Sequence, residues 1–129
     1  MVDDDRGFAD VVAWVLGLEG YQAEVYTDPV SALRAITARP PDLLLLDYRM
    51  PDGRGDDLLD ALADAGVYPR TIVLTGARGS EVRRLAARAI CVLHKPIDLG
   101  HLLRRLSVIL QARGSAEDTG SGPRRPEAA

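Results

Sequence analysis

The chain has 129 residues, of which 47% are hydrophobic, so a single domain with an ordinary hydrophobic core is expected. The net charge of −3 and the lack of a basic cluster argue against a nucleic-acid-binding surface. The lone cysteine, Cys91, excludes an internal disulfide bond, and no stretch approaches the roughly 18 apolar residues that a membrane span needs. We therefore expect a cytoplasmic protein that binds neither membrane nor nucleic acid.

In the first half of the chain, apolar runs alternate with segments of helical spacing. A strand stub at residues 1–3 precedes apolar residues spaced for a helix over residues 8–15. A second strand is predicted over residues 22–26. Asp28-Pro29 then predicts a helix start, because aspartate caps a helix and proline suits its first position. Residues 42–47 contain four consecutive leucines, which predict a strand buried on both faces of a parallel sheet.

The second half continues the same alternation. The predicted elements are a loop over residues 51–55, a helix over 58–65, a strand over 70–75, a helix over 82–89, a strand over 91–94 and a helix over 99–106. Five consecutive β-α units predict an α/β domain with a doubly wound parallel sheet over residues 1–113. Residues 114–129 contain no large apolar side chain, so we expect a disordered tail there.

Polar residues stand at the carboxyl ends of four predicted strands, where such sheets place their ligands. They are Asp3-Asp4-Asp5, Asp47, Thr75 and Lys95. A single aspartate at a strand end is usually a cap or a loop residue, but complementary groups at four ends favour a site. Several carboxylates repel one another unless a cation joins them, and a site of oxygen ligands suits Mg²⁺. A carboxylate can also act as a nucleophile and become an aspartyl phosphate.

With these residues, the sequence resembles the receiver domain of two-component response regulators. The resemblance covers about residues 2–112. The matching motifs are Val2-Asp3-Asp4-Asp5, Asp47-Tyr48-Arg49-Met50-Pro51 followed by Gly55, Thr75-Gly76, and Lys95-Pro96. It implies a flavodoxin-like fold with five parallel strands in the order 2-1-3-4-5, five helices and a cis Lys95–Pro96 bond.

The resemblance also implies a role for each site residue. Asp47 is the expected phosphoacceptor, Lys95 its partner and then that of the phosphoryl oxygens, and Thr75 the hydroxyl that contacts the phosphoryl group. The expected Mg²⁺ ligands are Asp3, Asp4, Asp47 and the backbone carbonyl of Arg49. The implied donor is a histidine kinase or a histidine phosphotransfer protein, and the downstream target is unknown. The chain is then not an enzyme beyond its own Mg²⁺-dependent phosphorylation and dephosphorylation.

The sequence departs from the family pattern at three points. Only Met1 and Val2 precede the acidic run, so we expect a truncated first strand, with either a true start upstream or a marginally stable domain. Val92 stands where the family often has a tyrosine or phenylalanine that moves upon phosphorylation. The interval from Thr75 to Lys95 is slightly short, so the partner surface near it cannot be inferred by analogy.

Three hypotheses remain open at this point. The first is a stand-alone receiver that switches partner binding when it is phosphorylated. The second is a degenerate receiver that binds its partner independently of phosphorylation. The third is a phosphatase of the haloacid-dehalogenase type, which needs a second aspartate two residues after the nucleophile, where this chain has Arg49.

Overall fold

The computed structural model describes residues 1–50, 53–76, 80–117 and 127–128. Within these ranges the helices are α1 (Arg6–Leu18), α2 (Pro29–Ala38), α3 (Gly55–Asp64), α4 (Ser80–Ala86) and α5 (Leu99–Glu117). The strands are β1 (Gln22–Ala23), β2 (Leu44–Asp47), β3 (Arg49–Met50), β4 (Gly53–Arg54), β5 (Thr71–Thr75), β6 (Cys91–His94) and β7 (Glu127–Ala128). None of the described helices is both long and apolar enough to pass through a bilayer.

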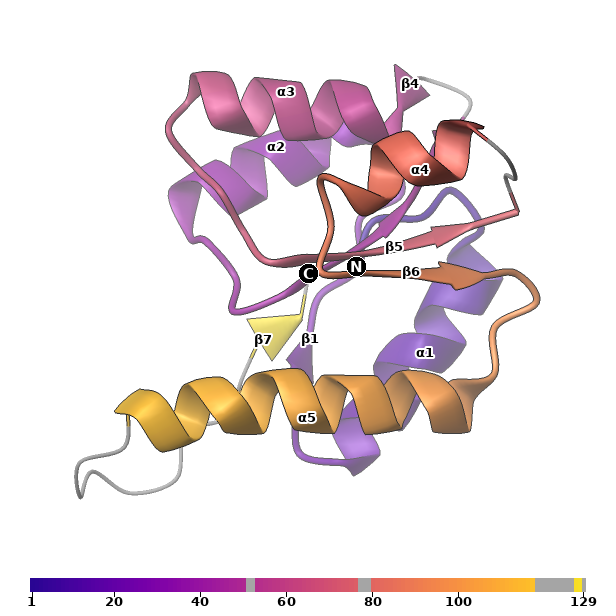
Figure 1. Cartoon of the computed structure of the whole chain (residues 1–129), viewed down its shortest axis with the longest axis vertical. Coiled ribbons are helices and arrows are strands. Elements are labelled where there is room, and N and C mark those ends of the chain that lie inside the picture. Colours follow the sequence, from indigo (N-terminus) through magenta and orange to yellow (C-terminus); the bar gives the residue numbers. More distant parts are fainter. Residues whose placement is uncertain (51–52, 77–79, 118–126, 129) are drawn as a thin grey trace.

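A parallel sheet in the order β2-β5-β6 forms the middle layer of the molecule. Figure 1 shows α2, α3 and α4 over one face of this sheet and α1 and α5 over the other. Helices on both faces explain why β2 and β5 are buried along their whole length, as the run of leucines predicted. The expected α/β fold with a parallel sheet and five helices is therefore confirmed.

The four leucines of the β2 region pack alternately toward the two helical layers. Leu43 and Leu45 belong to the core cluster under α1 and α5, whereas Leu44 and Leu46 belong to the cluster under α2 and α3. Alternate side chains of a strand point to opposite faces of the sheet, so one apolar run supplies both cores. The short segment thereby fixes the position of the residue that ends it, Asp47.

The expected first strand is reduced to Val2, which forms parallel bridges with Tyr26 on one side and Leu46 on the other. The N–H and the carbonyl of Val2 each make a hydrogen bond of 2.8 Å to the β2 segment, and the N–H of Asp3 donates to the carbonyl of Tyr26 at 3.0 Å. The unpaired backbone groups that a truncated strand predicts are thus partly satisfied. Tyr26 lies outside β1, whose residues Gln22 and Ala23 pair with β7 instead, so the predicted strand at 22–26 is divided between two partners.

Three further features differ from the sequence-based expectation. β4 lies within the region expected to be a loop at 51–55 and pairs antiparallel with β3, which directly precedes that region; residues 51–52 lie outside the described part. β7 pairs in parallel with β1, and α5 continues to Glu117. The domain boundary at residue 113 and the disorder of the tail stay predictions, because most of the tail lies outside the described residues.

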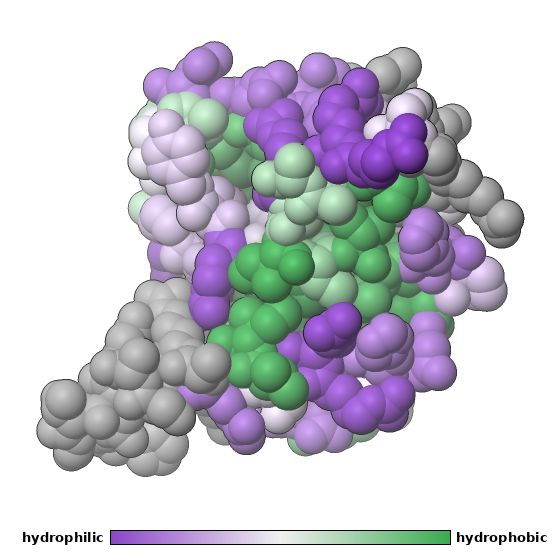
Figure 2. Space-filling model, in the orientation of Figure 1, coloured by the Kyte–Doolittle hydropathy of each residue, from purple (hydrophilic) through white to green (hydrophobic). Residues whose placement is uncertain are grey.

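The face that carries β6 is partly apolar at its surface. Among the described residues, β6 pairs only with β5, so it is the last strand of the named sheet on this side. In the orientation of Figure 1, hydrophobic residues gather across the middle of the face, between polar residues above and below (Figure 2). The exposed large hydrophobic residues of the molecule include Ile90, directly before β6, and Val108 of α5.

Gly55 begins α3 at a point where the helix touches the end of β2. A Cβ atom added there would lie 3.1 Å from Cδ2 of Leu46 and 3.2 Å from Cα of Tyr48. We expect Gly55→Ala to lower the free energy of unfolding by about 1–3 kcal/mol, measured by urea denaturation, because backbone next to Asp47 would have to move.

Gly17→Ala is the matched control for this prediction. Gly17 lies inside α1, and a Cβ atom there would meet nothing within 4 Å. We expect the control to be neutral or to stabilise the protein by about 0.5–1 kcal/mol. Equal stabilities of the two variants would contradict the tight contact at Gly55.

Candidate functional site

Three aspartates from two distant parts of the sequence meet at the carboxyl edge of the sheet. Asp3 follows the bridging residue Val2, and Asp47 ends β2. Asp3, Asp4 and Asp47 each offer a carboxylate oxygen, and these oxygens lie within 4.8 Å of one another. Asp3 and Asp47 are buried, whereas Asp4 is exposed. The result is a carboxylate cluster with two buried members and one that meets solvent.

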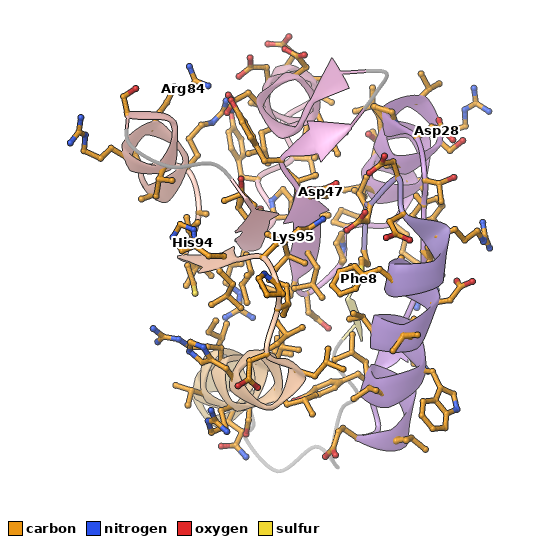
Figure 3. The ribbon with its side chains drawn as sticks, turned by 90° about the vertical axis from the view of Figure 1, so that its right-hand side faces the viewer. Phe8, Asp28, Asp47, Arg84, His94 and Lys95 are labelled. Atoms are coloured by element: carbon orange, nitrogen blue, oxygen red, sulfur yellow. The ribbon has the colours of Figure 1, made fainter. Side chains whose placement is uncertain are left out.

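Lys95, the residue directly after β6, brings the opposite charge to this cluster. Its Nζ lies 3.4 Å from Oδ2 of Asp3 and 3.3 Å from Oδ1 of Asp47. Figure 3 shows the side chains of Asp47 and Lys95 side by side. The N–H of Lys95 donates to the carbonyl of Thr75 at 2.9 Å, and the Lys95–Pro96 bond is cis, as the resemblance implied. One ammonium is therefore shared between two buried carboxylates.

The carboxylate cluster holds more negative than positive charge. Burial first, and then the charge of Asp3, raise the pKa of Asp47 to about 7 against the opposing influence of Lys95. A hydrogen bond with Asp4 acts in the same direction as burial. Partial burial tends to lower the pKa of Lys95, but Asp47 and Asp3 outweigh it and hold the pKa above its ordinary value. A single lysine does not neutralise three carboxylates, so a further cation is favoured here.

The donor set fits a hard divalent cation. Carboxylate oxygens are the ligands that Mg²⁺ prefers, and it usually binds one or two carboxylates and keeps several waters. Asp3, Asp4 and Asp47 supply such oxygens within the spacing of one ion. The Arg49 carbonyl belongs to β3, two residues after Asp47, and its part in binding a metal stays a prediction.

Thr75 ends β5, the strand next to β2. It is 1% exposed, and the strand register sets it beside His94, directly before Lys95. Asp47 pairs in register with Leu74, the residue before Thr75. The strand ends that the sequence analysis assigned to Asp47, Thr75 and Lys95 therefore lie on neighbouring strands at one edge. The contact of the Thr75 hydroxyl with a phosphoryl group stays a prediction.

The aspartates of the acidic run at the N-terminus have two roles, a helix cap and the carboxylate cluster. Asp5 caps α1, since its side chain accepts a hydrogen bond from the N–H of Phe8 at 3.0 Å. Oδ1 of Asp3 accepts from the N–H of Asp5 at 2.9 Å, which fixes the buried carboxylate against the helix start. Asp3 and Asp4 remain for the carboxylate cluster.

Tyr48, the residue after Asp47, has no role that the sequence predicts. Its side chain is 1% exposed and packs on Val73, with Val92 at the margin of the same cluster. Its hydroxyl accepts a hydrogen bond from Arg84 of α4, which also forms an ion pair with Asp56 of α3 at 3.0 Å. An aromatic residue directly after the end of a buried strand was the available signal, but its partner on α4 could not be predicted from the sequence.

Comparison with known proteins points to one family. The sequence model described as "Response regulator receiver domain" matches residues 1–107. The chain is similar to "Response regulator MprA" of Mycobacterium ulcerans, with 37% identity over 121 residues, covering 92% of this chain and 51% of the relative. It is also similar to "Transcriptional regulatory protein TrcR" of Mycobacterium tuberculosis, with 32% identity over 120 residues, 91% of this chain and 46% of the relative. The chain spans about half the length of the curated relatives it matches.

Solved structures give the same result for the fold. A CheY-like response regulator receiver domain from Methanospirillum hungatei superposes with a TM-score of 0.77 and 29% identity, covering 89% of this chain and 94% of that one. A response regulator receiver domain from Francisella superposes with a TM-score of 0.78 over 87% of this chain and 94% of that chain. At 24% identity, this second likeness supports the fold alone.

Proposed function

The chain belongs to the response regulator receiver domain family, and from this premise we propose that it takes a phosphoryl group from a phosphohistidine donor onto Asp47 and so switches the binding of a partner. The observation that carries the proposal is the arrangement around Asp47. A buried carboxylate lies within a cluster of three, 3.3 Å from the ammonium of Lys95. This arrangement supports phosphoryl transfer, which needs positioning and charge neutralisation more than covalent assistance from the protein.

In the proposed reaction, a carboxylate oxygen of Asp47 forms a bond to phosphorus. The bond between phosphorus and the donor imidazole nitrogen breaks, and the nitrogen keeps the electron pair. Lys95, already beside the Asp47 oxygen, is placed to bind the phosphoryl oxygens. Asp3, Asp4 and Asp47 would hold Mg²⁺, with the Arg49 carbonyl as a further ligand. The bound ion would neutralise charge on the phosphoryl oxygens.

The proposed donor is a histidine kinase or a histidine phosphotransfer protein, and the proposed setting is the cytoplasm. In this proposal the chain has no catalytic activity beyond its own phosphorylation and dephosphorylation, and Thr75 contacts the bound phosphoryl group. Counted along the chain, the five predicted strands lie in the order 2-1-3-4-5 in this proposal, and the bridges of Val2 with Tyr26 and Leu46 support that order.

One observation favours a second candidate, a receiver that binds its partner without phosphorylation. Val92 takes the place where the family often has a mobile aromatic residue, and it packs against the cluster formed by Tyr48 and Val73. The intact set of Asp47, Thr75 and Lys95 favours the phosphorylated switch instead.

Intact mass measurement separates the two candidates. We expect wild-type protein incubated with acetyl phosphate and Mg²⁺ to gain the mass of one phosphoryl group, and EDTA to prevent the gain. Asp47→Asn should gain nothing, because an amide does not form the acyl phosphate. A folded wild type that gains no phosphoryl group, or an Asp47→Asn variant that gains one equally, would reject the proposal.

A further inference from the structure

A phenylalanine from the first turn of α1 faces the ammonium of Lys95. Nζ of Lys95 lies over the ring of Phe8, 5.4 Å from its centroid. In Figure 3, Lys95 lies between the labelled side chains of Asp47 and Phe8. An ammonium within about 6 Å of an aromatic face is attracted by the negative face of the ring. Lys95 therefore has three neighbours that favour its charge, two carboxylates and one ring.

The ring is held in place by its surroundings. The backbone N–H of Phe8 donates to the capping side chain of Asp5, which fixes the first turn of α1 beside the acidic run. The side chain is partly buried and packs against the core cluster under α1 and α5. Phe8 therefore presents a fixed surface to Lys95.

Lys95 itself is less constrained. Its side chain is 34% exposed, and the contacts of 3.3 Å and 3.4 Å with the carboxylates are longer than tight charge-assisted hydrogen bonds. A lysine side chain is flexible, and its ammonium is strongly hydrated. Without another contact, Nζ would be expected to spend part of its time in solvent, away from the Asp47 oxygen.

We propose that Phe8 is a positioning residue for Lys95. The face of the Phe8 ring holds the Lys95 ammonium between Asp3 and Asp47 when the phosphoryl group arrives. The inference rests on the proposed phosphorylation of Asp47 and adds a residue to it. Phe8 does not touch the reacting atoms; it acts through Lys95. If Phe8 is only a core residue, its contribution depends on the volume of the ring and not on the electron density of the ring face.

Fluorination of the ring separates these two readings. Phe8 is the only phenylalanine in the chain, so replacing phenylalanine throughout by mono-, di- and trifluorinated forms changes this ring alone. The volume changes little, while the negative potential of the ring face falls with each fluorine. We expect the rate of phosphorylation by acetyl phosphate at saturating Mg²⁺ to fall stepwise, by about two- to fivefold over the series. Phe8→Leu should fall to a similar extent, and Phe8→Tyr should retain the rate.

The dependence on Lys95 is tested in a Lys95→Met background. There the fluorination series should have no effect on the residual rate. A rate that is constant over the series in wild type, or a fluorine effect that persists in Lys95→Met, would overturn the inference.

A spectroscopic measurement tests the contact between Phe8 and Lys95 even if the wild type accepts no phosphoryl group. The ¹⁹F resonance of the monofluorinated protein should shift in Lys95→Met. It should not shift in Arg105→Gln, which removes an exposed charge from α5. An unchanged resonance in Lys95→Met would overturn the contact, whereas failed phosphorylation alone would reject the function and leave this result standing.

Discussion

Asp47→Asn is expected to raise the free energy of unfolding of the metal-free protein by about 2–4 kcal/mol at pH 8. The Asp47 side chain is buried beside Asp3, and these two effects raise its pKa from 3.8 to about 7. Each pKa unit corresponds to about 1.4 kcal/mol, so a shift of this size costs at most about 4 kcal/mol once the group is ionised. Asparagine keeps the shape and removes the charge, and Lys95 keeps its contact with Asp3 at 3.4 Å.

The sign of the pH dependence follows from the direction of this shift. Below pH 3.8, Asp47 is protonated in both the folded and the unfolded protein, and its ionisation costs nothing. Between pH 3.8 and about 7 the folded protein keeps a proton that the unfolded chain has lost, so stability falls as pH rises. The advantage of Asp47→Asn should therefore be small near pH 4 and complete above pH 7.

The measurement must be a difference between variants, because another buried group contributes a pH dependence of stability with the opposite sign to that of Asp47. Burial lowers the pKa of the Met1 ammonium from 8.0 to about 4, which makes stability rise with pH over a similar range. This contribution cancels when wild type and Asp47→Asn are compared by urea denaturation at the same pH in EDTA. Asp64→Asn, which removes a carboxylate at the exposed end of α3, is the control and should show no such gain.

An Asp47→Asn variant that is no more stable than wild type at pH 8 would contradict the electrostatic description of the site. The expected gain in stability also makes Asp47→Asn a better control for the phosphorylation experiment. A variant that is more stable yet accepts no phosphoryl group cannot have lost that capacity by unfolding. Functional sites commonly retain such unfavourable charges at a cost in stability.

The parts of the fold that local sequence determines were predictable. The run of four leucines, Leu43 to Leu46, predicted the buried strand, since consecutive apolar residues in a strand must be covered on both faces of the sheet. Asp28 and Pro29 predicted the start of α2, and the side chain of Asp28 does accept from the N–H of Ser31 at 2.8 Å. The edge where Asp47 and Lys95 meet followed from the parallel order of the strands.

The parts that depend on distant partners were not predictable. The predicted strand at 22–26 is divided between β7, which pairs with β1, and Val2, which forms a bridge with Tyr26; both partners lie far from it in the sequence. The hydrogen bond of Tyr48 with Arg84 and the contact of Phe8 with Lys95 each join residues that only the tertiary fold brings together. Neither contact has a sequence spacing that identifies it, because each depends on where a helix lies over the sheet.

Asp3→Asn is expected to weaken Mg²⁺ binding by about tenfold or more at pH 8, as measured by isothermal titration calorimetry. Asp3 is fully buried and supplies one of three carboxylates whose oxygens lie within 4.8 Å of one another. Removing its charge removes both a ligand of full charge and part of the repulsion that a bound cation relieves. The amide keeps an oxygen that can still accept the hydrogen bond from the N–H of Asp5, so the start of α1 should be preserved.

A second consequence of the same change works in the opposite direction and fixes the choice of pH. Asp3 is one of the causes that raise the pKa of Asp47, so Asp3→Asn lowers that pKa and reduces competition between protons and metal. Near pH 6 this would mask part of the loss, whereas at pH 8 Asp47 is largely ionised in both proteins. Asp64→Asn again serves as the control and should bind Mg²⁺ as wild type does. If Asp3→Asn bound the ion as tightly as wild type at pH 8, the carboxylate cluster would not be its site, since a buried charge within it would contribute nothing to holding the ion.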